Sequence, residues 1–185
     1  MPADQIKSAK GKLLEKPIDF LSVVEFLGGL VEKEVNFTHH LDSQTNILIS
    51  ISTALFLLSS SSFLGGNRDL SLLIISLFSG LSTLVGLLAV HPPRFMREHG
   101  QEESILFTKS ISHFKSAKEF EEEVTRVVVD HEKIVSQYSL ELYNLAKYYY
   151  RPKRTLFRWA RNLLLLGIAL GLFSFLIEIL VKSSI

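Results

Sequence analysis

The sequence predicts an all-α integral membrane protein with three transmembrane helices and a cytoplasmic helical domain that contains one long amphipathic helix. The first observation is composition: of 185 residues, 47% are hydrophobic and only 21% are charged, whereas soluble domains usually carry more charge. The second is that the apolar residues gather in three runs long enough to cross a bilayer core of ~30 Å as helices. The third is that apolar residues elsewhere recur at three- and four-residue steps, without the alternation of a strand.

Charge and cysteine content exclude several classes of function. Twenty basic and nineteen acidic residues leave a net charge of +1, so the chain lacks the basic excess of a nucleic-acid-binding domain. Without cysteine, it has no disulfide framework, cysteine nucleophile or thiolate metal site. The sequence also contains no glycine-rich phosphate loop, nucleophile elbow or zinc-binding helix motif. We therefore expect no enzyme activity, no cofactor and no metal site.

Three apolar runs are predicted to span the membrane, at about residues 47–64, 70–90 and 163–181. The first two contain no charged residue, and the third contains only Glu178, near its end. A helix needs about 20 residues to cross the hydrocarbon core, and each run is close to that length. The short link 65–69 separates the first two runs, so we expect them to form a hairpin.

The basic residues predict the orientation of these spans. Eighteen of the twenty Lys and Arg residues lie before the first run or between the second and third, and two, Arg68 and Lys182, lie elsewhere. Because basic residues remain on the cytoplasmic side, we expect a cytoplasmic N-terminus and an external C-terminus. The predicted segments are an N-terminal cytoplasmic helical segment (1–43), a transmembrane hairpin (44–91), a cytoplasmic sensor and oligomerisation domain (92–160), and the third span with a short external tail (161–185).

Residues that begin and end helices predict the segment before the first span and the end of the second. Apolar residues from Phe20 to Leu41 follow helical spacing. Asp19 is the expected N-cap of this helix, and a bend is expected at Gly28-Gly29. The sequence His91-Pro92-Pro93 should end the second span, because proline cannot continue a helix.

The middle segment is predicted to contain a capped amphipathic helix. Ser116-Ala-Lys-Glu119 has the pattern of a capping box at a helix N-terminus. Helical spacing then continues from Phe120 to about Tyr150, which predicts one helix of more than thirty residues. Arg151-Pro152 is expected to break or kink this helix before the third span.

Two polar pairs have the residue types of metal ligands, but their spacing does not favour a metal site. His39 and His40 are adjacent, with Asp42 nearby, and neighbours on a helix point about 100° apart. Asp130-His131 is the dyad type found in phosphohydrolases, whose chemistry needs further His and Asp ligands from other helices. We expect structural roles for both pairs.

Small residues in the spans predict helix association. The third span contains Gly167 and Gly171 at a four-residue spacing, and the first two spans are rich in Ser and Thr. Such residues let helix backbones approach closely and form hydrogen bonds between helices. We expect association within one subunit or between several. We also expect a homo-oligomer that forms through the spans and the long cytoplasmic helix, with a subunit contact at the third span.

Several short motifs are arranged as in one known family. The first span begins with Asp42-x-x-x-Asn46, the second ends at His91-Pro92-Pro93, and Lys147-Tyr148-Tyr149 precedes the third. Over roughly residues 35–180, this arrangement resembles the transmembrane effector family of the Pycsar antiphage systems, in which a pyrimidine cyclase makes cyclic CMP or cyclic UMP on infection. A basic residue is often found in that family where this chain has Gln44.

The resemblance implies an antiphage defence effector in the bacterial inner membrane. A cyclic pyrimidine mononucleotide would activate it, and it would then impair the membrane and arrest the infected cell. The implied partners are the cyclic mononucleotide, the lipid bilayer and a nucleotide cyclase, but no nucleic acid polymer. Two alternatives remain: a SLATT-like membrane effector of a cyclic-oligonucleotide defence system, and a ligand-free membrane scaffold subunit.

A cyclic mononucleotide also implies a type of site. It carries one negative charge and a base, so it needs a cation and usually an aromatic face. These groups occur together in the middle segment, and the expected ligand-binding residues are Arg94, Arg97, Arg151, Lys153, Arg154 and Tyr148. Asp42 and Asn46, where the first span begins, are expected to couple or pack helices. The alternative is that the basic residues only fix the orientation and contact anionic headgroups.

Overall fold

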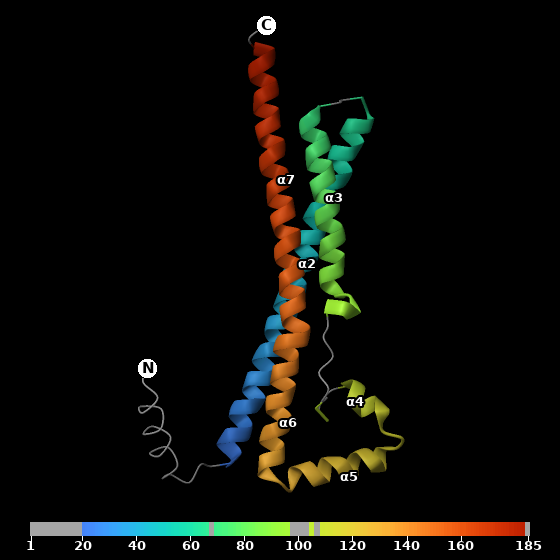
Figure 1. The fold of residues 1–185 in the computed structure, drawn as a ribbon, viewed down its shortest axis with the longest axis vertical. Coiled ribbons are helices and arrows are strands. Elements are labelled where there is room, and N and C mark those ends of the chain that lie inside the picture. The colour runs from blue at the N-terminus through green and yellow to red at the C-terminus, as the bar shows by residue number, and fades with distance from the viewer. Residues whose placement is uncertain (1–19, 67–68, 97–103, 106–107, 184–185) are drawn as a thin grey trace, which may run out of the picture. The chain divides into compact units, whose positions relative to one another are not determined.

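The computed structural model describes residues 20–66, 69–96, 104–105 and 108–183, which contain helices and turns but no strand (Figure 1). The all-α fold class is therefore confirmed. The elements are α2 (Phe20–Leu64), α3 (Leu70–Val90), a 3-10 turn η1 (Arg94–Met96), α4 (Thr108–His113), α5 (Ala117–Val128), α6 (His131–Asn144), a π-helical turn η2 (Leu145–Tyr150) and α7 (Arg151–Ser183).

Three helical stretches are long and apolar enough to cross a membrane, in agreement with the three predicted spans. They are α2, α3 and the stretch His131–Ser183, which contains α7. The first predicted span ends with α2 at Leu64, and the second coincides with α3. Helix α3 ends where predicted, because the His91 N–H donates the last helical hydrogen bond to the Leu87 carbonyl and two prolines follow.

Contacts divide the chain into two units, which are described separately. The helical unit comprises Met1–Glu34 and Gln101–Asn144, and the membrane unit comprises Val35–Gly100 and Leu145–Ile185. Residues 145–160, which we assigned to the middle segment from the sequence, therefore group with the three apolar helices. The predicted N-cap Asp19 lies outside the described residues, and α2 continues through Gly28 and Gly29 without interruption.

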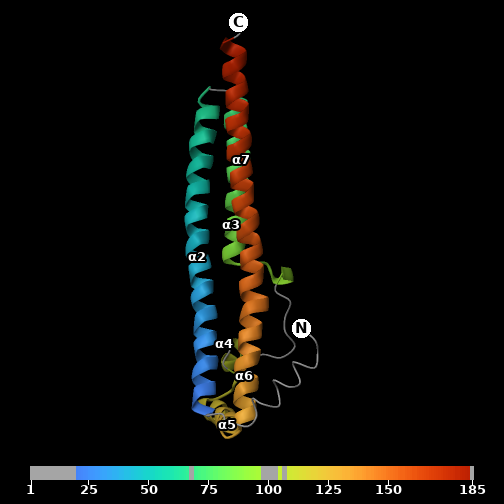
Figure 2. The ribbon, with the colours of Figure 1, turned by 90° about the vertical axis from the view of Figure 1, so that its left-hand side faces the viewer.

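In the membrane unit, α7 packs closely against α3 (Figure 2). Gly167 and Gly171 are buried in this contact. A Cβ atom at Gly167 would overlap Phe78, and one at Gly171 would overlap Ile75. The described neighbours of both glycines thus belong to the same chain, where the absence of side chains permits close approach of two helices.

Hydroxyl groups connect all three apolar helices. The Ser52 and Ser82 hydroxyls are 3.0 Å apart and join α2 to α3. Ser82 also donates a 2.8 Å hydrogen bond to the Ala160 carbonyl of α7. Towards the turn of the hairpin, the Ser60 and Ser76 hydroxyls are 2.6 Å apart. Buried hydroxyls need such partners, since an unsatisfied polar group is costly in an apolar environment.

In the helical unit, the predicted capping box is present at the start of α5. The Glu119 N–H donates to the Ser116 hydroxyl at 3.2 Å. The Glu119 carboxylate accepts from the Lys115 N–H at 2.8 Å, one residue before the position that a standard capping box uses. These bonds satisfy donors that the first helical turn cannot satisfy internally.

The prediction of one continuous helix from Phe120 to Tyr150 is wrong at Val129 and Asp130, where α5 and α6 are separated (Figure 1). Asp130 is the reason, because its carboxylate accepts hydrogen bonds from the Glu132 and Lys133 N–H groups at 3.1 and 3.4 Å and caps α6. The Lys133 ammonium, 3.3 Å away, holds the pKa of Asp130 below its usual value.

A second set of contacts attaches residues 104–105 to α6. The Ile105 N–H donates to the Gln137 side-chain oxygen at 2.9 Å. Glu141, one turn later on α6, is only 8% exposed and hydrogen-bonded to Ser104. Burial raises the pKa of Glu141 despite this hydrogen bond, and its Oε2 atom has no hydrogen-bond partner among the described residues.

Candidate functional site

The predicted ligand-binding residues gather at the start of α7, as far as the structure describes them. Arg151, Lys153 and Arg154 occupy its first turn, and Tyr148 precedes them in η2. The backbone of Arg94 belongs to η1, but its side chain lies outside the described set, as does all of Arg97.

The expected break at Pro152 takes the form of a π-helical turn. Proline has no N–H to donate to the carbonyl four residues earlier, and its ring crowds that carbonyl. The six residues before Arg151 instead form the wider turn η2, and the chain remains helical through Pro152. Such turns change the angular spacing of side chains along a helix. This change sets the directions of Tyr148 and Tyr149 relative to Lys153.

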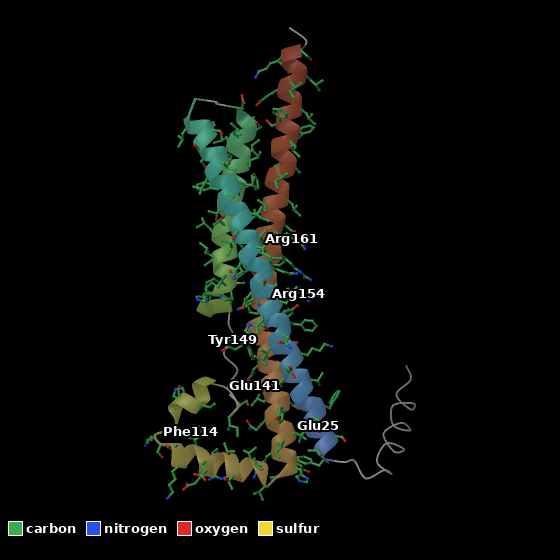
Figure 3. All side chains as sticks on the ribbon, turned by 180° about the vertical axis from the view of Figure 1, so that it is seen from behind. Glu25, Phe114, Glu141, Tyr149, Arg154 and Arg161 are labelled. Atoms are coloured by element: carbon green, nitrogen blue, oxygen red, sulfur yellow. The ribbon has the colours of Figure 1, made fainter. Side chains whose placement is uncertain are left out.

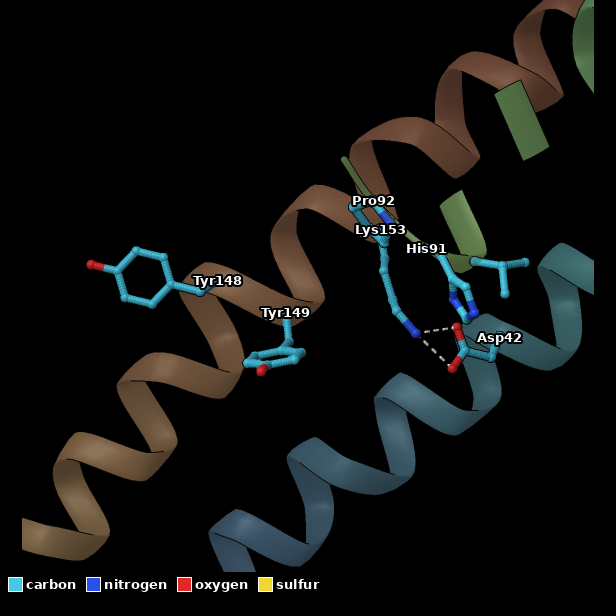
Figure 4. Close-up of a pocket in the computed structure, with 7 residues that line it drawn as sticks. Asp42, His91, Pro92, Tyr148, Tyr149 and Lys153 are labelled. Atoms are coloured by element: carbon cyan, nitrogen blue, oxygen red, sulfur yellow. Dashed lines mark hydrogen bonds and ion pairs between the residues drawn. The ribbon is translucent and has the colours of Figure 1, made fainter. Parts of the chain in front are cut away.

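The central contact of the site is an ion pair between Asp42 of α2 and Lys153 of α7 (Figure 4). The Lys153 ammonium donates to both carboxylate oxygens, at 2.7 and 2.8 Å. The Lys153 side chain is 15% exposed and that of Asp42 is 32% exposed. Partial burial weakens solvent screening and strengthens the Coulomb attraction, while it also removes water from both charges.

A cavity of about 240 Å³ adjoins this ion pair. Its lining comes from all three apolar helices and from η2: Asp42, Val90, His91, Pro92, Tyr148, Tyr149 and Lys153. In Figure 4 the His91 ring lies beside the ion pair, and the Tyr148 ring points away from it. The cavity thus combines a cation, a carboxylate, an imidazole and aromatic side chains where the end of α3 meets the first turn of α7.

A second hollow, of about 300 Å³, lies on another side of Tyr148. Its described lining contains two cationic residues and no acidic one: Phe95, Met96, Lys147, Tyr148, Arg151, Pro152 and Thr155. The Lys147 ammonium lies 5.1 Å from the centre of the Tyr148 ring, within the range of a cation–π interaction. In the described lining of this hollow the charged residues are cations, whereas the cation of the first cavity is paired with Asp42.

The remaining predicted residues lie outside both cavities. The Arg154 guanidinium is 5.7 Å from the centre of the Tyr150 ring, a cation–π contact. Figure 3 labels Arg154 and Arg161 along the same helix. Asn46 is exposed, and its carbonyl accepts a 2.9 Å hydrogen bond from Ser50.

Sequence reasoning separated two residues that the structure pairs. We expected Lys153 to bind ligand and Asp42 to couple or pack helices, yet they form one ion pair across 111 positions of sequence. His91 and Tyr149 line the cavity but are not among the expected ligand-binding residues. The four-residue spacing of Tyr149 and Lys153 was the available signal, since such residues share one face of a helix.

The histidine pairs have local partners in the described part of the chain. His40 is hydrogen-bonded to Gln44 at 3.0 Å. The His131 ring stacks on Phe20 with 3.7 Å between ring centres, within the helical unit. Among the described residues, no three His, Cys, Asp or Glu side chains are grouped to hold a metal ion.

Comparison with known families identifies the chain. The family model described as the Pycsar effector protein domain matches residues 32–179. The chain belongs to the Pycsar effector transmembrane family. The match includes α2 from residue 32, all of α3, η2, and α7 up to residue 179, and with them Asp42 and both hollows at the start of α7. No curated protein and no solved structure matches the chain. The protein is thus a membrane protein of antiphage defence, as the sequence motifs predicted.

Proposed function

We propose that this Pycsar effector is activated by a cyclic pyrimidine mononucleotide, cyclic CMP or cyclic UMP. Once active, it impairs the bacterial inner membrane and arrests the infected cell. A nucleotide cyclase is its functional partner and supplies the ligand. In this proposal the protein is not an enzyme, works as a homo-oligomer and has a cytoplasmic N-terminus. The family match supports this reading over a ligand-free scaffold, because the family implies a nucleotide signal and a membrane context.

The observation that carries the proposal is the pair of cavities on either side of Tyr148. Each combines a cation on α7, Lys153 or Arg151, with aromatic side chains. A cyclic mononucleotide has one negatively charged phosphate, which a Lys or Arg side chain binds with charge-assisted hydrogen bonds. Its planar base can stack on an aromatic ring. Both types of recognition are therefore available where α7 approaches the end of α3.

A ligand at this position can act directly on the spans, because it contacts the helices that form them. The cavity beside Lys153 is lined by residues of α2, α3 and α7, so an occupant contacts all three apolar helices. It activates the protein only if it binds the active arrangement more tightly than the resting one. A change in how the helices approach one another at this point then alters the packing of the spans.

The proposal is tested by ligand binding to the full chain in lipid nanodiscs. Isothermal calorimetry with cyclic CMP and cyclic UMP should give saturable binding, whereas cyclic AMP and a cyclic dinucleotide should bind much more weakly. Lys153→Met should weaken binding at least about tenfold, equivalent to 1.4 kcal/mol. Lys118→Met is the matched control, because Lys118 is an exposed lysine on α5. Binding of neither pyrimidine nucleotide would refute the proposed ligand class.

A further inference from the structure

We infer that the Asp42–Lys153 ion pair is a latch that holds the protein inactive, and that the phosphate of the activating nucleotide opens it by competing with Asp42 for Lys153. This inference rests on the proposed function and assigns the cavity beside the pair as the site of competition. The latch joins α2 to α7 directly, through two hydrogen bonds of 2.7 and 2.8 Å.

Competition follows from the charges that line the cavity. Lys153 is the cationic side chain in the described lining, and Asp42 engages it with both carboxylate oxygens. A phosphate group cannot form the same contacts while the carboxylate holds them. An anion that takes over these two hydrogen bonds displaces Asp42, and the carboxylate left behind repels it. Ligand binding and separation of the pair become one coupled step.

The second hollow does not have this property. Its described lining contains neither Asp42 nor Lys153, so an anion can bind there while the latch stays closed. Of these two cavities in the described part of the chain, the one beside Lys153 makes binding of an anion and release of α2 mutually dependent. This difference selects it as the regulatory site.

The rest of the membrane unit determines what the latch controls. Helix α7 is packed against α3 through Gly167 and Gly171 and is hydrogen-bonded to it through Ser82. Helix α2 is attached to α3 through the Ser52 and Ser60 hydroxyls. The ion pair is a direct side-chain bond between α2 and α7, and its loss leaves both of these contacts to α3 in place. Opening therefore shifts α2 relative to α7 without unfolding the unit.

The same chemistry is offered by a free nucleotide and by an anionic lipid headgroup, since both present a phosphate monoanion. The experiment therefore uses proteoliposomes of phosphatidylcholine alone and of phosphatidylcholine mixed with phosphatidylglycerol. Release of an entrapped dye is followed before and after addition of cyclic CMP or cyclic UMP. If the wild-type protein releases no dye from either kind of vesicle until nucleotide is added, the nucleotide is the ligand that opens the ion pair. Leakage caused by phosphatidylglycerol alone overturns that assignment.

Three changes test the latch itself. Asp42→Asn should release dye without nucleotide, at least about tenfold faster than the wild type. The reversed pair, Asp42→Lys with Lys153→Asp, should again release no dye without nucleotide, because the two charges still attract each other after the exchange. Glu122→Gln, on an exposed carboxylate of α5, should behave like the wild type.

Affinity separates a latch from a merely structural ion pair. If Asp42 competes with the ligand, Asp42→Asn should bind cyclic CMP or cyclic UMP at least about tenfold more tightly. A pair that only stabilises the fold would leave the affinity unchanged or lower it. If Asp42→Asn does not insert into the membrane, the variant with the reversed ion pair is used instead. No dye release together with lost nucleotide binding would support the latch, whereas retained nucleotide binding would overturn it.

The failures of the two proposals are distinguishable. If Asp42→Asn stays silent without nucleotide while both it and the wild type respond to nucleotide equally, the latch is refuted and the proposed function stands. If the wild type responds to neither pyrimidine nucleotide, the proposed ligand is refuted, and with it the assignment of the opener.

Discussion

Gly167 of α7 lies so close to Phe78 of α3 that even a single added methyl group would overlap the phenylalanine side chain. The contact is buried and lies within one chain. The sequence predicted that Gly167 and Gly171 associate helices, within one subunit or between several, and the contacts described here lie within one subunit. Homo-oligomerisation remains a prediction, and these glycines do not identify its surface.

Gly167→Ala should destabilise the membrane unit by about 1–3 kcal/mol, because an added methyl group overpacks the contact with Phe78. Unfolding in a denaturing detergent, followed by circular dichroism, measures the change. Gly29→Ala is the matched control: a Cβ at this exposed helical position meets nothing within 4 Å, so it should stabilise the chain by roughly 0.5–1 kcal/mol. Equal stability of the two variants would argue against the packing described here.

Ser82→Ala should also weaken the membrane unit, because Ser82 bonds to Ser52 on one side and to the Ala160 carbonyl on the other. Hydrogen bonds between membrane helices are worth ~0.6–2 kcal/mol each. The same unfolding assay should show a loss of ~0.6–4 kcal/mol, the range for one to two such bonds. Ser62→Ala, on an exposed serine near the end of α2, should change stability little, and a similar loss there would mean that the assay reports on serine content alone.

The stability of the helical unit should depend on pH through Glu141. Burial raises its pKa above the ordinary value of 4.5, so the folded state holds this proton more tightly than the unfolded state. The contribution of Glu141 to folding stability is therefore fully present below pH 4.5. It is lost as the pH rises through the raised pKa that Glu141 has in the folded state. Glu141→Gln should remove this loss and melt at a higher temperature than the wild type at neutral pH.

Glu122→Gln serves as the control for that experiment, because Glu122 is exposed. Its melting temperature should follow that of the wild type at every pH. Between about pH 4.5 and neutrality, the wild type should lose stability relative to Glu141→Gln. If it does not, the account of Glu141 is wrong.

The predicted orientation is tested by labelling single cysteines, which the natural chain lacks. Asn67→Cys and Ser184→Cys should react with a membrane-impermeant maleimide in intact cells. Gln101→Cys should react only after permeabilisation. This pattern follows from the eighteen basic residues expected on the cytoplasmic side, and labelling of Gln101→Cys in intact cells would reverse the topology.

The sequence predicted those features that depend on local chemistry. The limits of α3 follow from an uncharged run and two prolines, and the start of α5 follows from Ser116. The interruption at Asp130 was missed, because apolar spacing continued through it while a local carboxylate cap ended the helix. The Asp42–Lys153 pair was missed for a different reason: its partners are 111 residues apart, and only helix packing brings them together.

The most direct test of the account is dye release from proteoliposomes that contain the wild-type protein, with cyclic CMP, cyclic UMP or cyclic AMP added outside. Full-length protein reconstituted with the side that carries Lys153 outward should release the dye on addition of a pyrimidine cyclic nucleotide. Lys153→Met should gain no release on addition of the nucleotide. Release that is equal with cyclic AMP, or no release with either pyrimidine nucleotide, would contradict the proposal that a cyclic pyrimidine nucleotide activates this effector.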